Sequence, residues 1–423
     1  MKIRTWHLFI ISFILHLAVV VAIGHYKEPR LWENGGIALN LYEGRGFSAS
    51  FSLPNEPTTW QAPGYPYLLY FFWKAMGQGT ATYVAISVMQ CLFLASMVWP
   101  MAAISARWFP RVPVWVVQLL TVVAPLYLWY GTRFHHTAIV MALHPWLLQA
   151  WLSWAGRGVG KSVWVGILTA LAALFQPILL GVFGVVGFVR LVFAGLGRRW
   201  KEFIHLALAG VVVVLGLLPW TIRNYQTQGR LVLIKGSLGK ELWMGNNPNA
   251  TGTGYAIGGD EEITNKFPPR AFELRGKVRE IELMDAMKKE AIEWIRENPG
   301  EFFHLTAKKI WWFWTLAPKD RVRSTGAAEA LVFRGIYTFY WTVLVILTVG
   351  GLMLYRISFE QAGILVLFIC FYSVIYGLTH VGQARFRGEI EYIFLPAAAG
   401  CLYYIGNLLM ARLGVKPASQ ATD

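Results

Sequence analysis

Long apolar runs alternate with short polar segments along most of the chain. A helix that crosses a hydrocarbon core of ~30 Å needs about 20 mostly apolar residues. Runs of this kind, or slightly shorter ones, lie at 8–24, 81–104, 114–130, 137–154, 162–175, 178–194, 203–219, 331–355, 361–378 and 390–410. The pattern predicts an all-α polytopic membrane protein with about ten transmembrane helices. The two runs that flank Gln176 and Pro177 form either two short helices or one broken helix.

Composition agrees with the membrane class. Hydrophobic residues make up 56% of the 423 residues, charged residues only 14%, and the mean hydropathy is +0.46. Lys2 and Arg4 precede the first apolar run, as in cleavable signal peptides, but the many following runs and the lack of an A-x-A site favour a retained helix. The net charge of +15 lies mostly in short loops, where it sets topology, so we expect no nucleic-acid partner.

The basic loops predict which polar segments lie outside the cytoplasm. With the N-terminus inside, every inner loop is basic, as the positive-inside rule requires. These loops contain Arg107, Arg111, Arg157, Lys161, Arg198, Arg199, Lys201, Arg356, Arg412 and Lys416. The segments 26–80, 131–136, 220–330 and 379–389 then lie on the outer face. We therefore expect an N-terminal membrane domain at 1–219, with a first outer loop at 25–80.

The segment 220–330 is the one long polar region. It contains Gly- and Asn-rich turns and then a helical pattern at about 277–297, which ends at an Asn-Pro-Gly sequence. We expect a small α-rich extracytoplasmic module at 220–330. The remainder, 331–423, is predicted to hold the C-terminal transmembrane helices and a short cytoplasmic tail.

Glu33 follows the first apolar run, within a Trp-Glu-Asn-Gly-Gly sequence at the predicted membrane face. A carboxylate at the mouth of a helical bundle can act as a general base on a hydroxyl group. On position alone a solvated loop acid is the more common case. Glu28, Glu43 and Glu56 are rival acids in the same loop.

Arg385 and Arg387 precede the last apolar run. Two guanidinium groups at this spacing can converge on one phosphate, although Glu389 and Glu391 also permit a cluster of salt bridges. Weaker candidates for phosphate binding on the same face are Arg133, Arg223, Lys235 and Lys240.

Other catalytic signals are weak. The pair His135 and His136 is a poor metal signal by itself, and His380 is equally ambiguous. The sequence contains no P-loop before a helix and no G-x-S-x-G motif. Charged residues avoid the centres of the apolar runs, which argues against an ion-coupled transporter. A lipid or glycan flippase and a non-catalytic envelope-assembly subunit remain alternatives to an enzyme.

Five stretches together resemble a known family of membrane enzymes. The first outer loop contains E-x-G-G-I-A-x-x-L-x-x-G-x-G-F-S at 33–48 and P-T-T-W-Q-A-P-G-Y-P at 57–66. Further stretches at 218–225, 291–302 and 384–387 follow in the expected order. The chain resembles GT-C glycosyltransferases, in particular the family 39-like bacterial group related to protein mannosyltransferases and aminoarabinose transferases. The resemblance runs from residue 33 to residue 391.

The resemblance implies a reaction and a set of roles. Such enzymes take a sugar from a polyprenyl-phosphate donor, of the undecaprenyl type in bacteria, and transfer it with inversion to an envelope lipid, glycan or protein. They lie in the bacterial inner membrane with the active site on the extracytoplasmic face. By position, Glu33 is the catalytic base, although many relatives have Asp there, and Arg385 and Arg387 bind the donor phosphate. Further donor or acceptor contacts are expected from Tyr65, Arg133, His135, His136, Arg223, Lys235 and Glu391. Some relatives use a divalent metal, but the sequence specifies no ligand set, so no cofactor is assigned.

Overall fold

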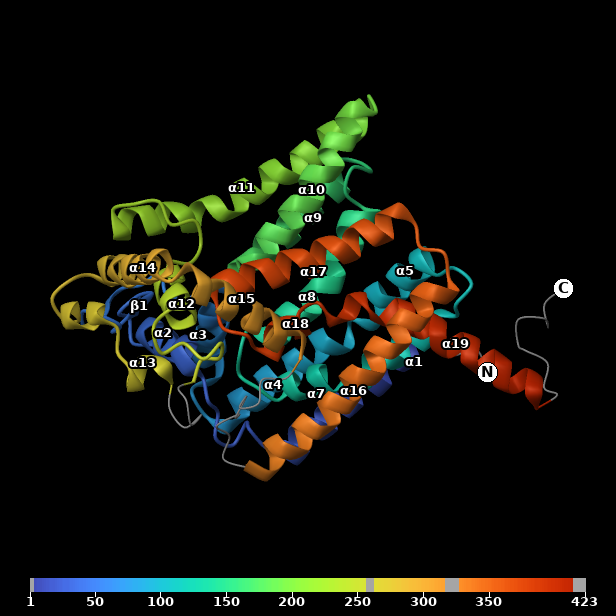
Figure 1. The fold of residues 1–423 in the computed structure, drawn as a ribbon, viewed down its shortest axis with the longest axis horizontal. Helices are drawn as coiled ribbons and strands as arrows, with labels where there is room; N and C mark the ends of the chain where they lie inside the picture. The colour runs from blue at the N-terminus through green and yellow to red at the C-terminus, as the bar shows by residue number, and fades with distance from the viewer. Residues whose placement is uncertain (1–3, 256–261, 316–326, 414–423) are drawn as a thin grey trace.

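The computed structural model describes residues 4–255, 262–315 and 327–413, and these residues are mostly helical (Figure 1). Seven helical segments in this part of the chain are long and apolar enough to cross a membrane. They are α1 (Thr5–Ile23), α4 with α5 (Thr80–Ala95 and Val98–Trp108), α10 (Ile178–Leu196), α11 (Trp200–Gln228), α16 (Ala327–Leu354), α17 (Phe359–Thr379) and η2 with α19 (Glu391–Ile393 and Leu395–Arg412). The chain is therefore an all-α, multi-pass membrane protein.

Each of the other predicted runs is also helical, but these helices are bent or short. The helices α6 (Val114–Val122) and α7 (Pro125–Gly131) meet at an angle of 48° and form an eighth span if they cross together. The helices α8 (Thr137–Ser153) and α9 (Val159–Phe175) have 17 residues each. Gln176 is extended, with φ of −150° and ψ of 111°, because the residue before a proline avoids the helical region. The ambiguous pair is thus two helices, α9 and α10.

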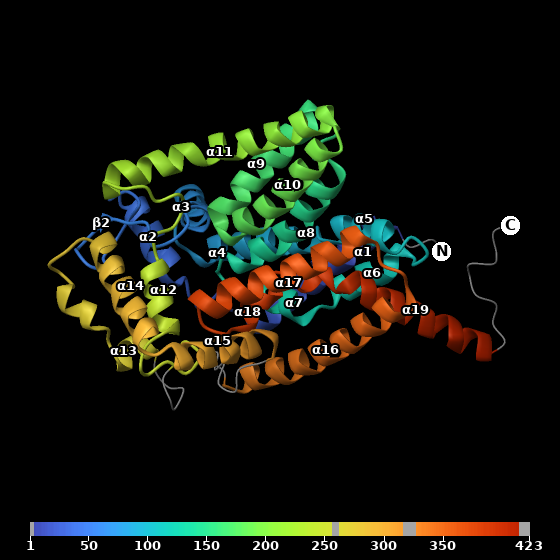
Figure 2. The same ribbon diagram turned by 45° about the horizontal axis from the view of Figure 1, so that its top comes forward.

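The polar elements gather at one end of the bundle, away from the two chain termini (Figures 1 and 2). From the first outer loop come α2 (Trp32–Tyr42), β1 (Ser48–Ala49), β2 (Glu56–Pro57) and α3 (Gly64–Met76). The segment 220–330 and the last loop supply α12 (Leu238–Gly245), α13 (Ile263–Lys266), η1 (Arg270–Leu274), α14 (Glu280–Glu297), α15 (Pro299–Trp314) and α18 (Ala384–Gly388). The two strands pair antiparallel, with Ala49 opposite Glu56. The expected tail after residue 413 lies outside the described residues.

A buried carboxylate and a half-buried guanidinium tie the first outer loop to the rest of this polar end. The Glu280 carboxylate, at the start of α14, accepts hydrogen bonds from the Thr58 hydroxyl group and from the Thr59 backbone N–H (2.9 Å). The Arg223 guanidinium, near the end of α11, donates to the carbonyl oxygens of Thr58 (2.7 Å) and Phe47 (2.6 Å). Each interaction joins segments far apart in sequence, so the loop has a defined position beside α12 and α14.

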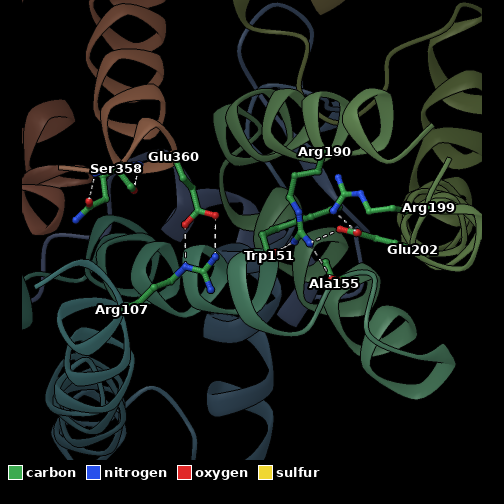
Figure 3. Close-up of polar contacts among 9 residues, drawn as sticks. Arg107, Trp151, Ala155, Arg190, Arg199, Glu202, Ser358 and Glu360 are labelled. Carbon is green, nitrogen blue, oxygen red and sulfur yellow. Dashed lines mark hydrogen bonds and ion pairs between the residues drawn. The ribbon is translucent and has the colours of Figure 1, made fainter. Parts of the chain in front are cut away.

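Ion pairs also connect helices in the part of the bundle that lies away from the polar elements (Figure 3). Arg107, at the end of α5, donates two hydrogen bonds of 2.7 Å to Glu360 at the start of α17. Arg190 of α10 contacts Glu202 of α11 at 3.0 Å, and Arg199 contacts the same carboxylate at 2.7 Å. Each of these arginines has a carboxylate partner nearby, and helix packing accounts for its position.

Candidate active site

Charged and polar side chains from five separate segments meet in a half-buried recess beside α2. We define the recess by Glu33, His135, His136, Lys235, Glu241, His380 and Arg385. Lys235 lies at its centre, since its charge interacts with those of Glu33, Glu241 and Arg385. All seven side chains are half-buried. Five of them were predicted to act on donor or acceptor, and the fold brings these five together.

Glu33 stands in the first turn of α2, where the positive end of the helix dipole favours a carboxylate. The preceding residue, Trp32, has φ of +47°, in the left-handed region that a bulky side chain rarely adopts. Within the described residues Glu33 makes no hydrogen bond or ion pair. Its carboxylate therefore remains able to accept a proton from a bound hydroxyl group.

The segment between α11 and α12 positions Lys235 and Glu241. The Gly236 N–H donates to the Thr59 carbonyl oxygen at 2.7 Å, and α12 approaches α14 so closely that a Cβ on Gly239 would lie 1.9 Å from the Met284 carbonyl oxygen. Burial lowers the pKa of Lys235, while Glu241 and Glu33 oppose that change. Burial alone would raise the pKa of Glu241, but His380, Lys235 and the neighbouring cations reverse the shift and lower it.

Arg385, in α18, has a guanidinium group with no hydrogen bond or ion pair to any described residue. The group lies over the Phe386 ring at 4.7 Å, and its Nε is buried without a partner. The nearby Glu389 carboxylate is 2% exposed and accepts a hydrogen bond from Tyr372 at 3.3 Å. Burial raises the pKa of Glu389 to about 8, even though Arg385 opposes the shift. At neutral pH Glu389 holds its proton, and the charge of Arg385 is left for an anion.

The two histidines form the wall of the recess nearest to Trp32. Their ring centroids are 4.0 Å apart, and the His135 ring meets Trp32 edge to face at 5.6 Å. Burial and the nearby cations lower the pKa of both imidazoles well below the usual value, so both are neutral at pH 7. Across the described part of the chain, no three His, Cys, Asp or Glu side chains form a metal site. The Nδ1 of His135 shares a hydrogen bond of 2.7 Å with the Thr137 hydroxyl.

Arg387 belongs to a different environment from Arg385, although only two residues separate them. Its side chain is 0% exposed and contacts Glu391 at 3.2 Å and the Tyr337 hydroxyl at 2.7 Å. It also donates to the carbonyl oxygens of Phe313 (2.9 Å) and Thr315 (3.1 Å) and lies 4.0 Å from the centroid of the Trp341 ring. Every part of this guanidinium faces protein, so the structure places Arg387 and Glu391 in a buried structural network outside the recess.

Three other candidates also lie outside the recess. Tyr65 is 1% exposed, and its hydroxyl donates to Gln90 at 2.9 Å. Arg223 holds the first outer loop through two carbonyl oxygens. Arg133 lies over the Trp129 ring at 4.4 Å and lines a separate cavity. The sequence analysis assigned no role to Glu241, and it considered Glu389 only as a member of a possible cluster of salt bridges.

An apolar groove leads to the recess from the side of α10. It has a volume of about 640 Å³ and passes between the start of α10, the segment before α12 and α14. Leu180, Leu233 and Met284 are among its lining residues, and Lys235 belongs to both the groove and the recess. Arg230, Asp285 and Lys288 also line the groove, so its apolar stretch is flanked by charged side chains. Apolar walls with cations beside them suit an amphipathic molecule with an anionic head.

Among comparisons with known proteins, only the comparison of structures finds similar proteins. No family model matches the sequence, and no curated protein matches it. The structure resembles that of the Archaeoglobus fulgidus oligosaccharyltransferase solved with a tethered acceptor peptide, with a TM-score of 0.53 and 12% identity over 98% of this chain and 52% of the other. The chain thus spans about half the length of that protein. ArnT from Cupriavidus metallidurans, solved with undecaprenyl phosphate, aligns at 13% identity over 97% and 81% of the two chains, with a TM-score of 0.43. The likeness to the oligosaccharyltransferase shows that the two proteins share a fold.

Proposed function

We propose that the chain is a membrane glycosyltransferase that moves a sugar from a polyprenyl-phosphate donor to an acceptor outside the cytoplasm. One observation carries the proposal: Lys235 joins a polar recess, which contains a free guanidinium and an unpaired carboxylate, to an apolar groove. A lipid phosphate needs both environments, because its chain avoids water and its head requires cationic donors. The fold shared with an oligosaccharyltransferase is compatible with this class of reaction.

Glu33 is the proposed general base. It accepts the proton of the acceptor hydroxyl while that oxygen forms a bond to the anomeric carbon. The bond between this carbon and the phosphate oxygen breaks on the opposite face, and the lipid phosphate leaves with the electron pair. A single displacement of this kind inverts the anomeric centre. Since base and leaving group lie on opposite faces of the sugar, the base and the phosphate-binding cations must flank it.

Arg385 and Lys235 are the proposed partners of the donor phosphate. Negative charge grows on the phosphate oxygens as the bond breaks, and preorganised cations in a half-buried site stabilise that charge more than water would. Arg385 suits the role because its guanidinium has no competing partner within the described residues. Neutral His135 and His136 supply hydrogen bonds to sugar hydroxyl groups without adding charge.

The polar module supports the site from outside the membrane domain. Both Lys235 and Glu241 come from the 220–330 segment, and the packing of α12 on α14 sets their positions. The positive-inside rule, applied to the basic loops, supports an extracytoplasmic position for this end of the bundle, and the proposed reaction puts it at a bacterial inner membrane. The acceptor then approaches from the periplasmic or outer side.

Replacement of Glu33 by Gln tests the assignment of the base. The amide has almost the same shape but cannot accept the proton, so we expect transfer to fall by about 10²–10⁴-fold. The assay follows transfer of a radiolabelled sugar from polyprenyl-phosphate donors to envelope extracts, with the full chain in nanodiscs. Glu43→Gln is the matched control, because Glu43 lies in the same loop and its half-exposed side chain pairs with Arg45.

The result has two clear readings. A folded Glu33→Gln protein with unchanged turnover removes Glu33 as base. If neither Glu33→Gln nor Arg385→Ala changes any transfer that depends on the chain, the protein is a non-catalytic subunit and the proposed activity is wrong.

A further inference from the structure

A second polar cavity lies next to the recess and is not used by the mechanism above. Its volume is about 280 Å³, and its walls come from the loop after α1 and the loop before α8. His25, Glu28, Arg30, Trp32 and Arg133 are among the residues that line it. Two guanidinium groups and one carboxylate therefore face a space large enough for a phosphate group and part of its carrier.

The cavity and the recess share one wall. Trp32 lines the cavity, whereas the next residue, Glu33, faces Lys235 in the recess. The same division occurs in the other loop, where Phe134 lines the cavity and His135 faces the recess. The contact between Trp32 and His135, at 5.6 Å between ring centroids, closes this wall. The cavity therefore lies across this wall from the recess that contains Glu33.

The cavity is positively charged and largely preformed. Arg133 is 7% exposed and lies over Trp129, which fixes the direction of its guanidinium. His25 accepts or donates a hydrogen bond at 3.0 Å with the Thr132 hydroxyl. Burial and the charges of Arg133 and Arg30 lower the pKa of His25 to about 4, so the imidazole is neutral at pH 7. A buried guanidinium held over Trp129, a second guanidinium at the exposed rim and a neutral hydrogen-bonding group beside them suit a phosphate better than a sugar hydroxyl.

We infer that this cavity binds a phosphate-bearing group of the acceptor and so holds the acceptor hydroxyl next to Glu33. The inference rests on the proposed glycosyl transfer and deepens it, because it names the chemical class of the acceptor. Arg30 and Arg133 bind the phosphate oxygens, and Trp32 packs against the adjoining part of the acceptor. The donor phosphate binds on the other side of the shared wall, at Arg385 and Lys235.

Binding of inorganic phosphate to the full chain in detergent, at low ionic strength, tests the inference. We expect two classes of site by isothermal titration calorimetry. Arg30→Gln should weaken one class about tenfold, the effect of losing one charge-assisted contact, and leave the other intact. Arg385→Gln should do the reverse. Lys27→Gln is the matched control, because it removes the same charge from the same exposed loop but does not line the cavity.

The outcomes separate this inference from the proposed function. Equal phosphate binding by Arg30→Gln, Lys27→Gln and the unaltered protein overturns the acceptor cavity, while a loss in Arg385→Gln still supports the donor site. A loss only in Arg30→Gln supports the cavity and removes Arg385 as the donor-phosphate group. Because Arg30 is exposed at the rim, its replacement should not disturb folding.

A second measurement distinguishes a lipid headgroup from a soluble phosphate. Nanodiscs of phosphatidylcholine alone are compared with nanodiscs that also contain phosphatidic acid, whose headgroup is a phosphate monoester. If phosphatidic acid displaces inorganic phosphate from the unaltered protein and from Lys27→Gln, but not from Arg30→Gln, the source is a lipid. If it displaces none, the cavity binds a soluble phosphate ester. The inference is wrong if neither experiment detects phosphate bound at Arg30.

Discussion

Arg385 and Arg387 lie two residues apart, and we expect their replacement to produce different defects. Arg385→Ala should weaken use of the donor without loss of stability, because this guanidinium has no hydrogen-bonded partner among the described residues. Arg387→Ala should destabilise the protein, because this guanidinium is fully enclosed. The family resemblance implies that both arginines bind the donor phosphate, whereas the structure puts them in different environments. The two variants test that distinction.

The size of the Arg387 effect follows from its contacts. Removal of one partner from a buried ion pair costs about 3–5 kcal/mol, since the other charge remains buried without compensation. Here Glu391 would be that charge, and the carbonyl oxygens of Phe313 and Thr315 would also lose their donor. The double variant Arg387→Met/Glu391→Met removes both charges and should recover most of the loss.

The Arg385 effect is expected in binding. A hydrogen bond to a charged group contributes about 1.5–3 kcal/mol, which corresponds to roughly a 10- to 150-fold rise in the apparent donor KM. The acceptor KM should stay the same. Arg296→Ala is a matched control, because Arg296 is an exposed arginine at the end of α14, away from the recess.

Denaturant titration followed by Trp fluorescence measures stability, and initial rates against donor concentration measure binding. The reasoning is refuted if Arg387→Ala unfolds at the same denaturant concentration as the unaltered protein while its donor KM rises. It is refuted equally if Arg385→Ala shifts the unfolding midpoint as far as Arg387→Ala does.

Two further predictions concern pH and packing. Glu389→Gln should abolish a rise in donor KM between pH 7 and pH 9, because Glu389, whose pKa burial raises to about 8, pairs with Arg385 only once ionised; a KM that rises equally in both proteins contradicts this. Because burial raises the pKa of Glu389 from 4.5 to about 8, the folded state binds a proton that the unfolded state releases. The free energy of unfolding should therefore fall as pH rises through about 8, and it should fall less in Glu389→Gln. Gly239→Ala should separate α12 from α14 and lower transfer together with stability, whereas Gly300→Ala, where a Cβ meets nothing within 4 Å, should be silent.

The fold was largely predictable because a bilayer demands long apolar helices. The ends of α10, α16 and α17 lie within a few residues of the runs read from sequence. The helix at 277–297 was likewise found as α14 (Glu280–Glu297). The count of about ten spans differs from the seven or eight helices that meet the length and hydropathy needed, because apolar composition alone does not show that α8 and α9 are short.

The site was predictable only in part. The roles of Glu33 and Arg385 were implied by the family resemblance, because position alone favoured a solvated acid at Glu33, and Lys235 was a weaker candidate as a cation on the outer face. Sequence spacing could not separate Arg385 from Arg387, since that distinction depends on Phe313 and Tyr337, which lie 74 and 50 residues from Arg387 in the chain. Glu241 could not be found because only the packing of α12 turns it toward the recess.

Under the proposed mechanism, we expect the protonation of Glu389 to affect the binding of a phosphate in the recess. Lys235 and Arg385 face Glu33 and Glu241, so these four groups are close to electrically neutral, and Lys240 is balanced by Glu262 at 3.6 Å. A third ionised acid would make the recess negative and repel the donor. Burial prevents this at neutral pH by keeping the proton on Glu389. With Glu389 protonated, the recess therefore has no net negative charge that would oppose a phosphate.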